Sequence, residues 1–231
     1  MELYDVMRTT AAVRAFRDEP VPDEMLYRIL DHARFATNGS NHQPWRVIVV
    51  RDTEQRRHLR DEYVNGAKEA WAYLEAGLQP FAPPAAGAHW VAAIDPVEAH
   101  AVERTIPMAD DLDKIPVLLL VCVELGKLAV TDLGLPRHSI VGGGSIYPFI
   151  HNILLAARNE GIGGLLATLV CRQEAELRNI FAIPDTHAVA AAVMLGHPVK
   201  AITKLSRRPV EHFTCVDRFD GPAFERPPTP S

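Results

Sequence analysis

The chain has 231 residues, of which 48% are hydrophobic and 23% charged, and its formal net charge is -5. This length suits one large domain with a substantial core, and the composition is ordinary for a folded globular protein. The negative balance argues against broad nucleic-acid binding, which needs a clustered basic face. We therefore interpret the basic run at residues 56–60 as a solvated helix face.

The cysteines and the apolar runs bear on the compartment. Cys122, Cys171 and Cys215 lie far apart and form no CxxC pair, which predicts buried, inert thiols in a reducing environment. The first residues lack a basic region followed by an apolar core, so we expect no signal peptide. The longest apolar run, at 115–123, is too short to span a bilayer. We expect a cytoplasmic protein.

In the first half of the chain, hydrophobic periodicity predicts helices over residues 2–10 and 22–36. A polar loop at 37–43 then leads into a β-branched strand at 46–50. A charged helix begins at 53 and runs through 63, with a pattern that extends to 74. Residues 77–114 are rich in Pro and Ala and show no clear period. Long irregular insertions in compact domains are often lids or binding loops. Their aromatic surface, which either faces a substrate or packs, comprises Trp71, Tyr73, Phe81 and Trp90.

In the second half, the continuous apolar run at 115–123 predicts a central strand buried on both faces. A loop at 132–138 and the sequence V-G-G-G-S at 141–145 precede a long helix at 146–160, which Gly161 ends. A strand at 165–170 containing Thr168, a short helix at 174–181 and a strand at 188–195 follow. The tail is expected to be disordered at 225–231. Strands interleaved with helices, without a repeat, predict an α/β or α+β fold with a mixed sheet.

The chain lacks several motifs that would name a chemistry directly. It has no nucleophile elbow, no P-loop and no H-E-x-x-H pair. His138, His151 and His197 have no ligand spacing, so we interpret them as packed or surface residues and expect no metal. The triple glycine at 142–144 lacks the order of a dinucleotide-binding fingerprint. A chain without an acid–base set can still be an enzyme if a cofactor carries the chemistry.

Three features suit a flavin when they are taken together. Arg14 is a lone cation able to pair with the N1 region of the ring, and Thr168 offers a hydroxyl to a ring nitrogen. Arg207 and Arg208 supply planar donors for a phosphate. Separately from these three features, the small and amide side chains of the loop at 37–43 let backbone N–H groups approach a planar polar ligand. The alternative interpretation is solvated arginines and an ordinary helix-to-strand turn.

The motifs of this chain, taken in their order along the sequence, resemble those of a known family. V-R-A-F-R-D-E-P-V-P at 13–22 and A-T-N-G-S-N-H-Q-P-W-R-V-I-V-V at 36–50 resemble the FMN-dependent nitroreductase family, whose pattern is R-R-S-V-R-x-F, a helix and A-P-S-x-x-N-x-Q-P-W. S-I-Y-P-F-I-H-N-I-L-L-A-A-R-N-E-G-I-G, G-H-P and L-S-R-R-P-V follow in the family's order. The resemblance spans residues 5–216. It implies one α+β domain over 1–231, with a variable insertion or lid at 77–114. It also implies a mixed, mostly antiparallel sheet flanked by helices and a domain-intertwined homodimer.

The resemblance also implies a cofactor and its ligands. FMN is expected at the subunit interface, with NADH or NADPH as electron donor and no side chain acting as a nucleophile. Arg14 holds the ring and ribityl side, and Arg207, with Arg208 beside it, binds the phosphate. Leu166, Ala167 and Thr168 flank the N5 edge of the ring. The residues that reach the flavin across the dimer are Asn38, Gly39, Ser40 and Asn41.

The chain departs from the family pattern at two places. Thr10, Ala11 and Ala12 stand where the family has R-R-S, so a cation and a hydroxyl are absent; Arg8, one turn earlier, is a candidate replacement. Thr37 and Asn38 replace the family's Pro and Ser. These departures keep open a weaker FMN affinity or another ligand.

The leading expectation is an enzyme in which NAD(P)H reduces FMN and the flavin reduces a nitroaromatic, quinone or similar acceptor. Three alternatives stay open, and fold-level analogy cannot choose among them. The first is a deazaflavin as the electron donor. The second is a non-catalytic flavin-binding carrier or sensor. The third is a sibling activity, namely dehalogenation, dehydrogenation or flavin fragmentation.

Overall fold

The computed structural model describes residues 1–82 and 93–227, so the expectations for Trp90 and for the end of the tail at 228–231 lie outside the described residues. The helices and strands follow the predicted order along the chain. The helices are α1 (Leu3–Thr9), α2 (Asp23–Ala33), α3 (Thr53–Glu75), α4 (Pro96–Ala101), α5 (Tyr147–Asn159) and α6 (Glu174–Phe181). The strands are β1 (Trp45–Val49), β2 (Val117–Glu124), β3 (Gly163–Ala167) and β4 (His187–Gly196).

The four strands form one sheet in the order β1-β2-β4-β3, and each neighbouring pair is antiparallel. β2 is central and is buried from Val117 to Val123, as its unbroken apolar sequence predicted. A parallel bridge between Ala12 and Gly164 adds the segment after α1 to the outer edge of β3. The expected α+β fold with a mixed, mostly antiparallel sheet is confirmed.

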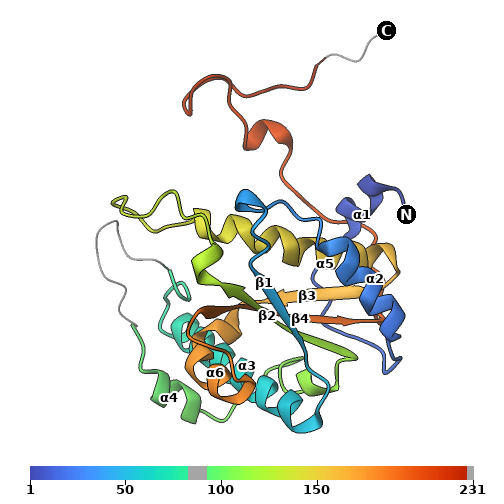
Figure 1. Ribbon diagram of the computed structural model, residues 1–231. Helices are drawn as coiled ribbons and strands as arrows, with labels where there is room; N and C mark the ends of the chain where they lie inside the picture. The colour runs from blue at the N-terminus through green and yellow to red at the C-terminus, as the bar shows by residue number, and fades with distance from the viewer. Residues whose placement is uncertain (83–92, 228–231) are drawn as a thin grey trace.

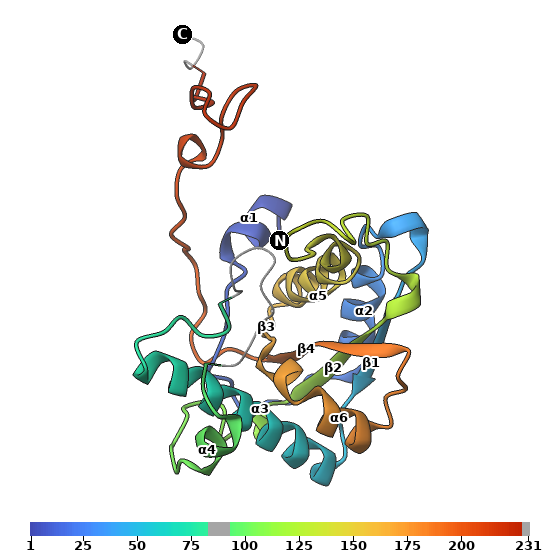
Figure 2. The ribbon, with the colours of Figure 1, turned by 90° about the vertical axis from the view of Figure 1, so that its left-hand side faces the viewer.

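Helices cover both faces of the sheet (Figures 1 and 2). α2 and α5 cover one face, where Ile29, Ile150 and Ile153 are fully buried and the Trp45 ring stacks on Phe149 at 4.6 Å between centroids. α3 and α6 cover the other face, with Leu59 and Leu177 at its core. The sheet therefore buries both of its faces, and functional groups must gather at its edges and ends.

Two expectations from the sequence are wrong. The predicted strand at 165–170 ends at Ala167, and Thr168 instead begins a 3₁₀ turn, η5 (Leu169–Gln173). The backbone N–H of Cys171 donates to the Thr168 carbonyl at 2.9 Å, which turns the chain away from β4. The apolar side chains that suggested a longer strand pack on α3 instead. Cys215 is exposed rather than buried, because it lies on the C-terminal arm.

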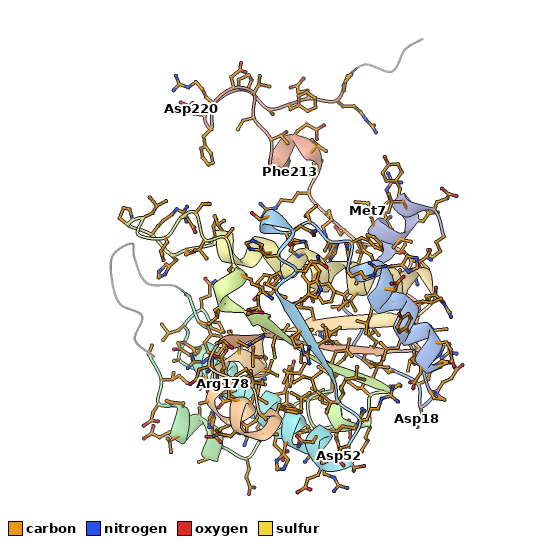
Figure 3. All side chains as sticks on the ribbon, in the orientation of Figure 1. Met7, Asp18, Asp52, Arg178, Phe213 and Asp220 are labelled. Carbon is orange, nitrogen blue, oxygen red and sulfur yellow. The ribbon has the colours of Figure 1, made fainter. Side chains whose placement is uncertain are left out.

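The arm after β4 leaves the body of the protein. The Ile202 carbonyl accepts from Arg158 of α5 at 3.4 Å, and by η6 (Val210–His212) the chain stands clear of the sheet (Figure 1). Phe213 and Phe219 on this arm are exposed, and Figure 3 shows Phe213 at the helical turn of the arm, outside the layers of the sheet and its helices. Among the described helices, none has both the length and the apolar character to cross a bilayer.

Candidate functional site

The loop before β1 has an unusual backbone. Ser40, Asn41 and Gln43 all have left-handed φ values, of 51°, 55° and 48°. Non-glycine residues adopt this region at a cost, so three in one short loop require a scaffold that holds them. Asn38 supplies it, because its Oδ1 accepts from the Gln43 N–H at 2.9 Å and its Nδ2 donates to the Ala36 carbonyl at 3.1 Å. Strain of this kind is typical of functional loops.

The base of this loop is fixed by a segment distant in sequence. The Gly39 N–H donates to the Oγ of buried Ser145 at 3.0 Å. A Cβ at position 39 would lie 2.8 Å from Cβ of Ala129, so the site admits glycine alone without rearrangement. Ser145 ends the triple-glycine turn η4 (Val141–Ser145), whose partner the sequence did not reveal. The Gly39 N–H is therefore used inside the protein.

Arg14 lies along the outer edge of the sheet. The Val13 N–H donates to the Gly164 carbonyl at 2.9 Å, and Phe16 bridges Pro198, so both flanks of Arg14 are fixed. Its side chain is exposed, and no hydrogen bond or ion pair within the described part of the chain engages it. Burial raises the pKa of Tyr63, and the positive charge of Arg14 partly offsets this rise. A fixed, unengaged guanidinium is a suitable anchor for an anionic or carbonyl-bearing ligand.

Arg14 also lines a cavity of about 310 Å³ between the segment at 14–18 and the segment at 108–116. Arg17 and Lys114 add two cations to it, and Asp111 holds the Lys114 ammonium at 2.6 Å. The described part of the 77–114 insertion thus forms one wall of the cavity beside Arg14. Its helical content is α4 and the short turn η2 (Leu112–Lys114).

Leu166, Ala167 and Thr168 lie at the end of β3, on the edge to which the Arg14 segment is joined. Ala167 is buried, Leu166 is half-buried and Thr168 is exposed. The parallel bridge between Ala12 and Gly164 lies two residues before Arg14 on one segment and two residues before Leu166 on β3. The predicted ring-binding residues therefore lie on two segments that meet at one edge of the sheet.

Thr10 belongs to the same edge, but its hydroxyl is engaged. Its Oγ1 donates to the Val6 carbonyl at 2.7 Å and closes the end of α1. Arg158 of α5 lies beside it, because its Nε donates to Thr9 Oγ1 at 2.9 Å and both threonines line the same small cavity. A cation from a distant helix thus stands close to the position where the N-terminal motif lacks one.

The remaining predicted residues lie elsewhere in a single chain. The loop with Asn38, Gly39, Ser40 and Asn41 precedes β1, and both β2 and β4 separate β1 from β3. Arg207 and Arg208 are exposed on the C-terminal arm, where Arg207 Nη1 donates to its neighbour's carbonyl, that of Ser206, at 2.7 Å. One chain therefore presents three separate parts: the β3 edge, the loop at the β1 edge and the arm.

Sequence reasoning missed two buried carboxylates. Glu69 on α3 is 2% exposed and Asp132 is 4% exposed, and each is surrounded by donors. Donation from the backbone N–H of Ile140, with Ser139 and Arg137, holds the Asp132 pKa well below its usual value. Carboxylates are common in exposed segments, so the sequence held no signal of their burial.

Cys122 and Cys171 are inert thiols, because burial raises their pKa values to about 11 and about 12.

The fold and this arrangement define a class: α+β proteins with one antiparallel sheet and the predicted binding residues at its two edges. Comparison with known sequences narrows it. A sequence model of the Nitroreductase family matches residues 7–197, and the chain belongs to that family. The resemblance of the N-terminal and core-helix motifs is therefore confirmed.

Relatives of known name are distant but cover most of the chain. Nitrobenzene nitroreductase of Ectopseudomonas oleovorans is 26% identical and aligns over 91% of this chain and 94% of its own length. NADH dehydrogenase of Thermus thermophilus is 26% identical over 87% of this chain and 88% of its own. Rat iodotyrosine deiodinase 1 is 23% identical over 87% of this chain and 64% of its own length.

Solved structures share the fold. A Desulfovibrio desulfuricans protein in complex with FMN superposes with a TM-score of 0.65 at 19% identity, covering 95% of this chain and 98% of that one. The NADPH:FMN oxidoreductase of Vibrio harveyi complexed with NAD⁺ also gives a TM-score of 0.65 at 18% identity, covering 94% of this chain and 77% of that one. At these identities the likeness concerns the fold.

Proposed function

We propose that the protein is an FMN-dependent NAD(P)H oxidoreductase that acts on a nitroaromatic, quinone or similar small acceptor. The observation that carries the proposal is Arg14, exposed and without a hydrogen bond or ion pair among the described residues, on a segment fixed to the edge of β3 in a chain of the nitroreductase family. Relatives named nitrobenzene nitroreductase and NADH dehydrogenase support the reaction class. The cavity beside Arg14 offers room for part of a planar ligand.

The residues present fit FMN. The flavin, when bound, takes a hydride from NADH or NADPH and passes electrons to the acceptor. Arg14 would stabilise negative charge at the N1 side of the bound ring, and the exposed Thr168 hydroxyl would donate at its N5 edge. Arg207 and Arg208 supply planar donors for the phosphate. Asn38 is hydrogen-bonded within its loop and the Gly39 N–H is bonded to Ser145, so we assign both residues the role of shaping the loop.

The loop and the arm support a homodimer with the flavin at the subunit interface. Within one chain β2 and β4 separate the loop before β1 from β3, and in our proposal the loop of a partner subunit completes the site. A groove of about 580 Å³ beside β1 and the end of α6 is open, while the arm of the same chain extends into solvent. If two subunits exchanged their arms, the groove of each subunit and the arm of its partner would both be buried.

Shared sites have a direct test. Arg14→Ala and Asn38→Ala variants, each inactive as homodimers, should regain about a quarter of the wild-type sites when co-expressed, because random pairing gives half heterodimers with one intact site each. Light scattering on the same samples measures the mass. No recovery in a mixed dimer, or a monomeric wild type, contradicts a site shared between subunits.

One observation favours a second candidate, a flavin-binding carrier or sensor. The N-terminal motif lacks the family cation, the Thr10 hydroxyl already donates to the Val6 carbonyl, and Arg8 is an exposed residue of α1.

Arg158 is better placed than Arg8 to supply the missing positive charge, because its Nε already donates to Thr9 Oγ1. Arg158→Met should therefore lower FMN affinity more than Arg8→Met. A larger loss of affinity in Arg8→Met would show that Arg8 supplies the missing charge.

Spectroscopy separates the candidates. The purified protein, reconstituted with FMN, should show a flavin spectrum that NADH or NADPH bleaches without oxygen and that an acceptor restores. A panel of nitroaromatics, quinones and halogenated aromatics then defines the acceptor. A protein that cannot take up FMN refutes the proposal. A flavin that neither NAD(P)H nor reduced deazaflavin bleaches establishes the carrier.

A further inference from the structure

A buried charge cluster joins α3 to the turn that Thr168 begins. The Glu69 carboxylate accepts from Arg172 Nε at 2.8 Å and from Gln173 Nε2 at 2.6 Å, and both donors belong to η5. His100 of α4 completes the cluster, with Nε2 2.9 Å from Glu69 Oε1. A carboxylate that is 2% exposed is tolerated because its oxygens are paired and hydrogen-bonded. One buried charge thus holds the whole end of η5.

The start of η5 meets the same face of α3 one turn earlier. Gly66 lies three residues before Glu69, so the two residues share a helix face. A Cβ at position 66 would lie 2.4 Å from the Leu169 carbonyl oxygen, closer than any side chain permits. Gly66 therefore lets the backbone of η5 rest on the helix, while Glu69 fixes its far end.

The opposite side of η5 is held by the sheet. The Cys171 thiol donates to the carbonyls of Val189 and Ala190 at 3.2 and 3.3 Å. β4 bulges at this point, where Cys122 pairs with Val189 instead of Ala190. η5 is thus clamped between helix and sheet, and Thr168, whose carbonyl accepts from the Cys171 N–H, has its place fixed by the clamp.

We propose that Gly66 and Glu69 are positioning residues that set the distance of Thr168 from the flavin ring. The proposal rests on the proposed function, because it needs a flavin beside Thr168. In this proposal neither Gly66 nor Glu69 touches the cofactor, and both residues act through η5. A shift of about 1 Å in a group that meets the reacting atoms can change a rate by orders of magnitude, so a clamp of this rigidity has a catalytic consequence.

The test compares variants of the full-length, FMN-loaded protein. Glu69→Gln presents an amide N–H₂ to two donors, Gln173→Leu removes one donor from η5, and Gly66→Ala lifts its start. Each should shift the midpoint potential and the visible circular dichroism of the flavin. Each should also slow flavin reduction on the order of tenfold. His100→Asn leaves both η5 donors on Glu69 and should leave these signatures unchanged.

A control and a cofactor-free readout keep the test decisive. Glu160→Gln removes another interhelical ion pair, with Arg28 at 2.8 Å, far from η5, and should lower stability without moving the flavin signatures. Hydrogen exchange of flavin-free protein should show faster exchange at 168–173 in the Glu69, Gln173 and Gly66 variants. Unchanged exchange there overturns the clamp. Faster exchange with unchanged flavin signatures overturns the positioning role, whereas a wild type that takes up no flavin overturns the proposed function instead.

Discussion

Asn38 offers a test of whether the loop before β1 is a ligand contact or a scaffold. In the Asn38→Ala variant the loop loses both side-chain bonds, to the Gln43 N–H at 2.9 Å and to the Ala36 carbonyl at 3.1 Å. Ser40, Asn41 and Gln43 then keep their left-handed backbone without that support. The scaffold view predicts that the variant is less stable even when no cofactor is present.

The magnitude follows from the two bonds. A hydrogen bond contributes about 1 kcal/mol net, so the variant should lose about 2 kcal/mol of unfolding free energy. In a domain of this size 1 kcal/mol moves Tm by about 2–4 °C, which predicts a fall of about 4–8 °C. Asn38→Asp keeps the acceptor for Gln43 and loses the donor to Ala36, so it should fall by about half as much.

Differential scanning calorimetry of flavin-free protein measures the shift, and titration with FMN measures the affinity. The scaffold view expects both to fall together in Asn38→Ala, with Asn38→Asp intermediate in each. If Tm stays within about 1 °C of the wild type while FMN affinity drops, the stability reasoning is refuted and Asn38 is a direct ligand.

Three further predictions concern the arm, the end of β3 and the buried carboxylate of Asp132. Arg207→Ala should weaken FMN retention at unchanged flavin-free Tm, since its side chain meets Ser206 of its own arm; a lower Tm in the flavin-free protein contradicts this. Thr168→Ala should change the flavin midpoint potential more than FMN affinity, as equilibrium dialysis and redox titration can decide. The depressed pKa of Asp132 means that its contribution to stability is present above about pH 3.9 and is lost as pH falls through the folded-state pKa; loss of hydrogen-exchange protection at 132–140 near pH 5 would contradict it.

The sequence by itself determined the elements and their type. Hydrophobic periodicity placed the long helices α2, α3 and α5, and the unbroken apolar run placed β2 at the centre of the sheet. The motif around Arg14 identified the family that the comparisons confirm over residues 7–197. These features are local, because each depends on residues within a few turns or one strand of each other.

Tertiary structure decided what those residues touch. Thr168 was expected within a strand at 165–170. The strand β3 ends instead at Ala167, one residue before Thr168, because η5 packs on α3. The Gly39 N–H, expected to face a ligand, is taken by Ser145, 106 residues away. Glu69 meets Gln173 across 104 residues. Hydrogen-bond partners so distant leave no periodic trace in a sequence, because the fold alone brings them within reach.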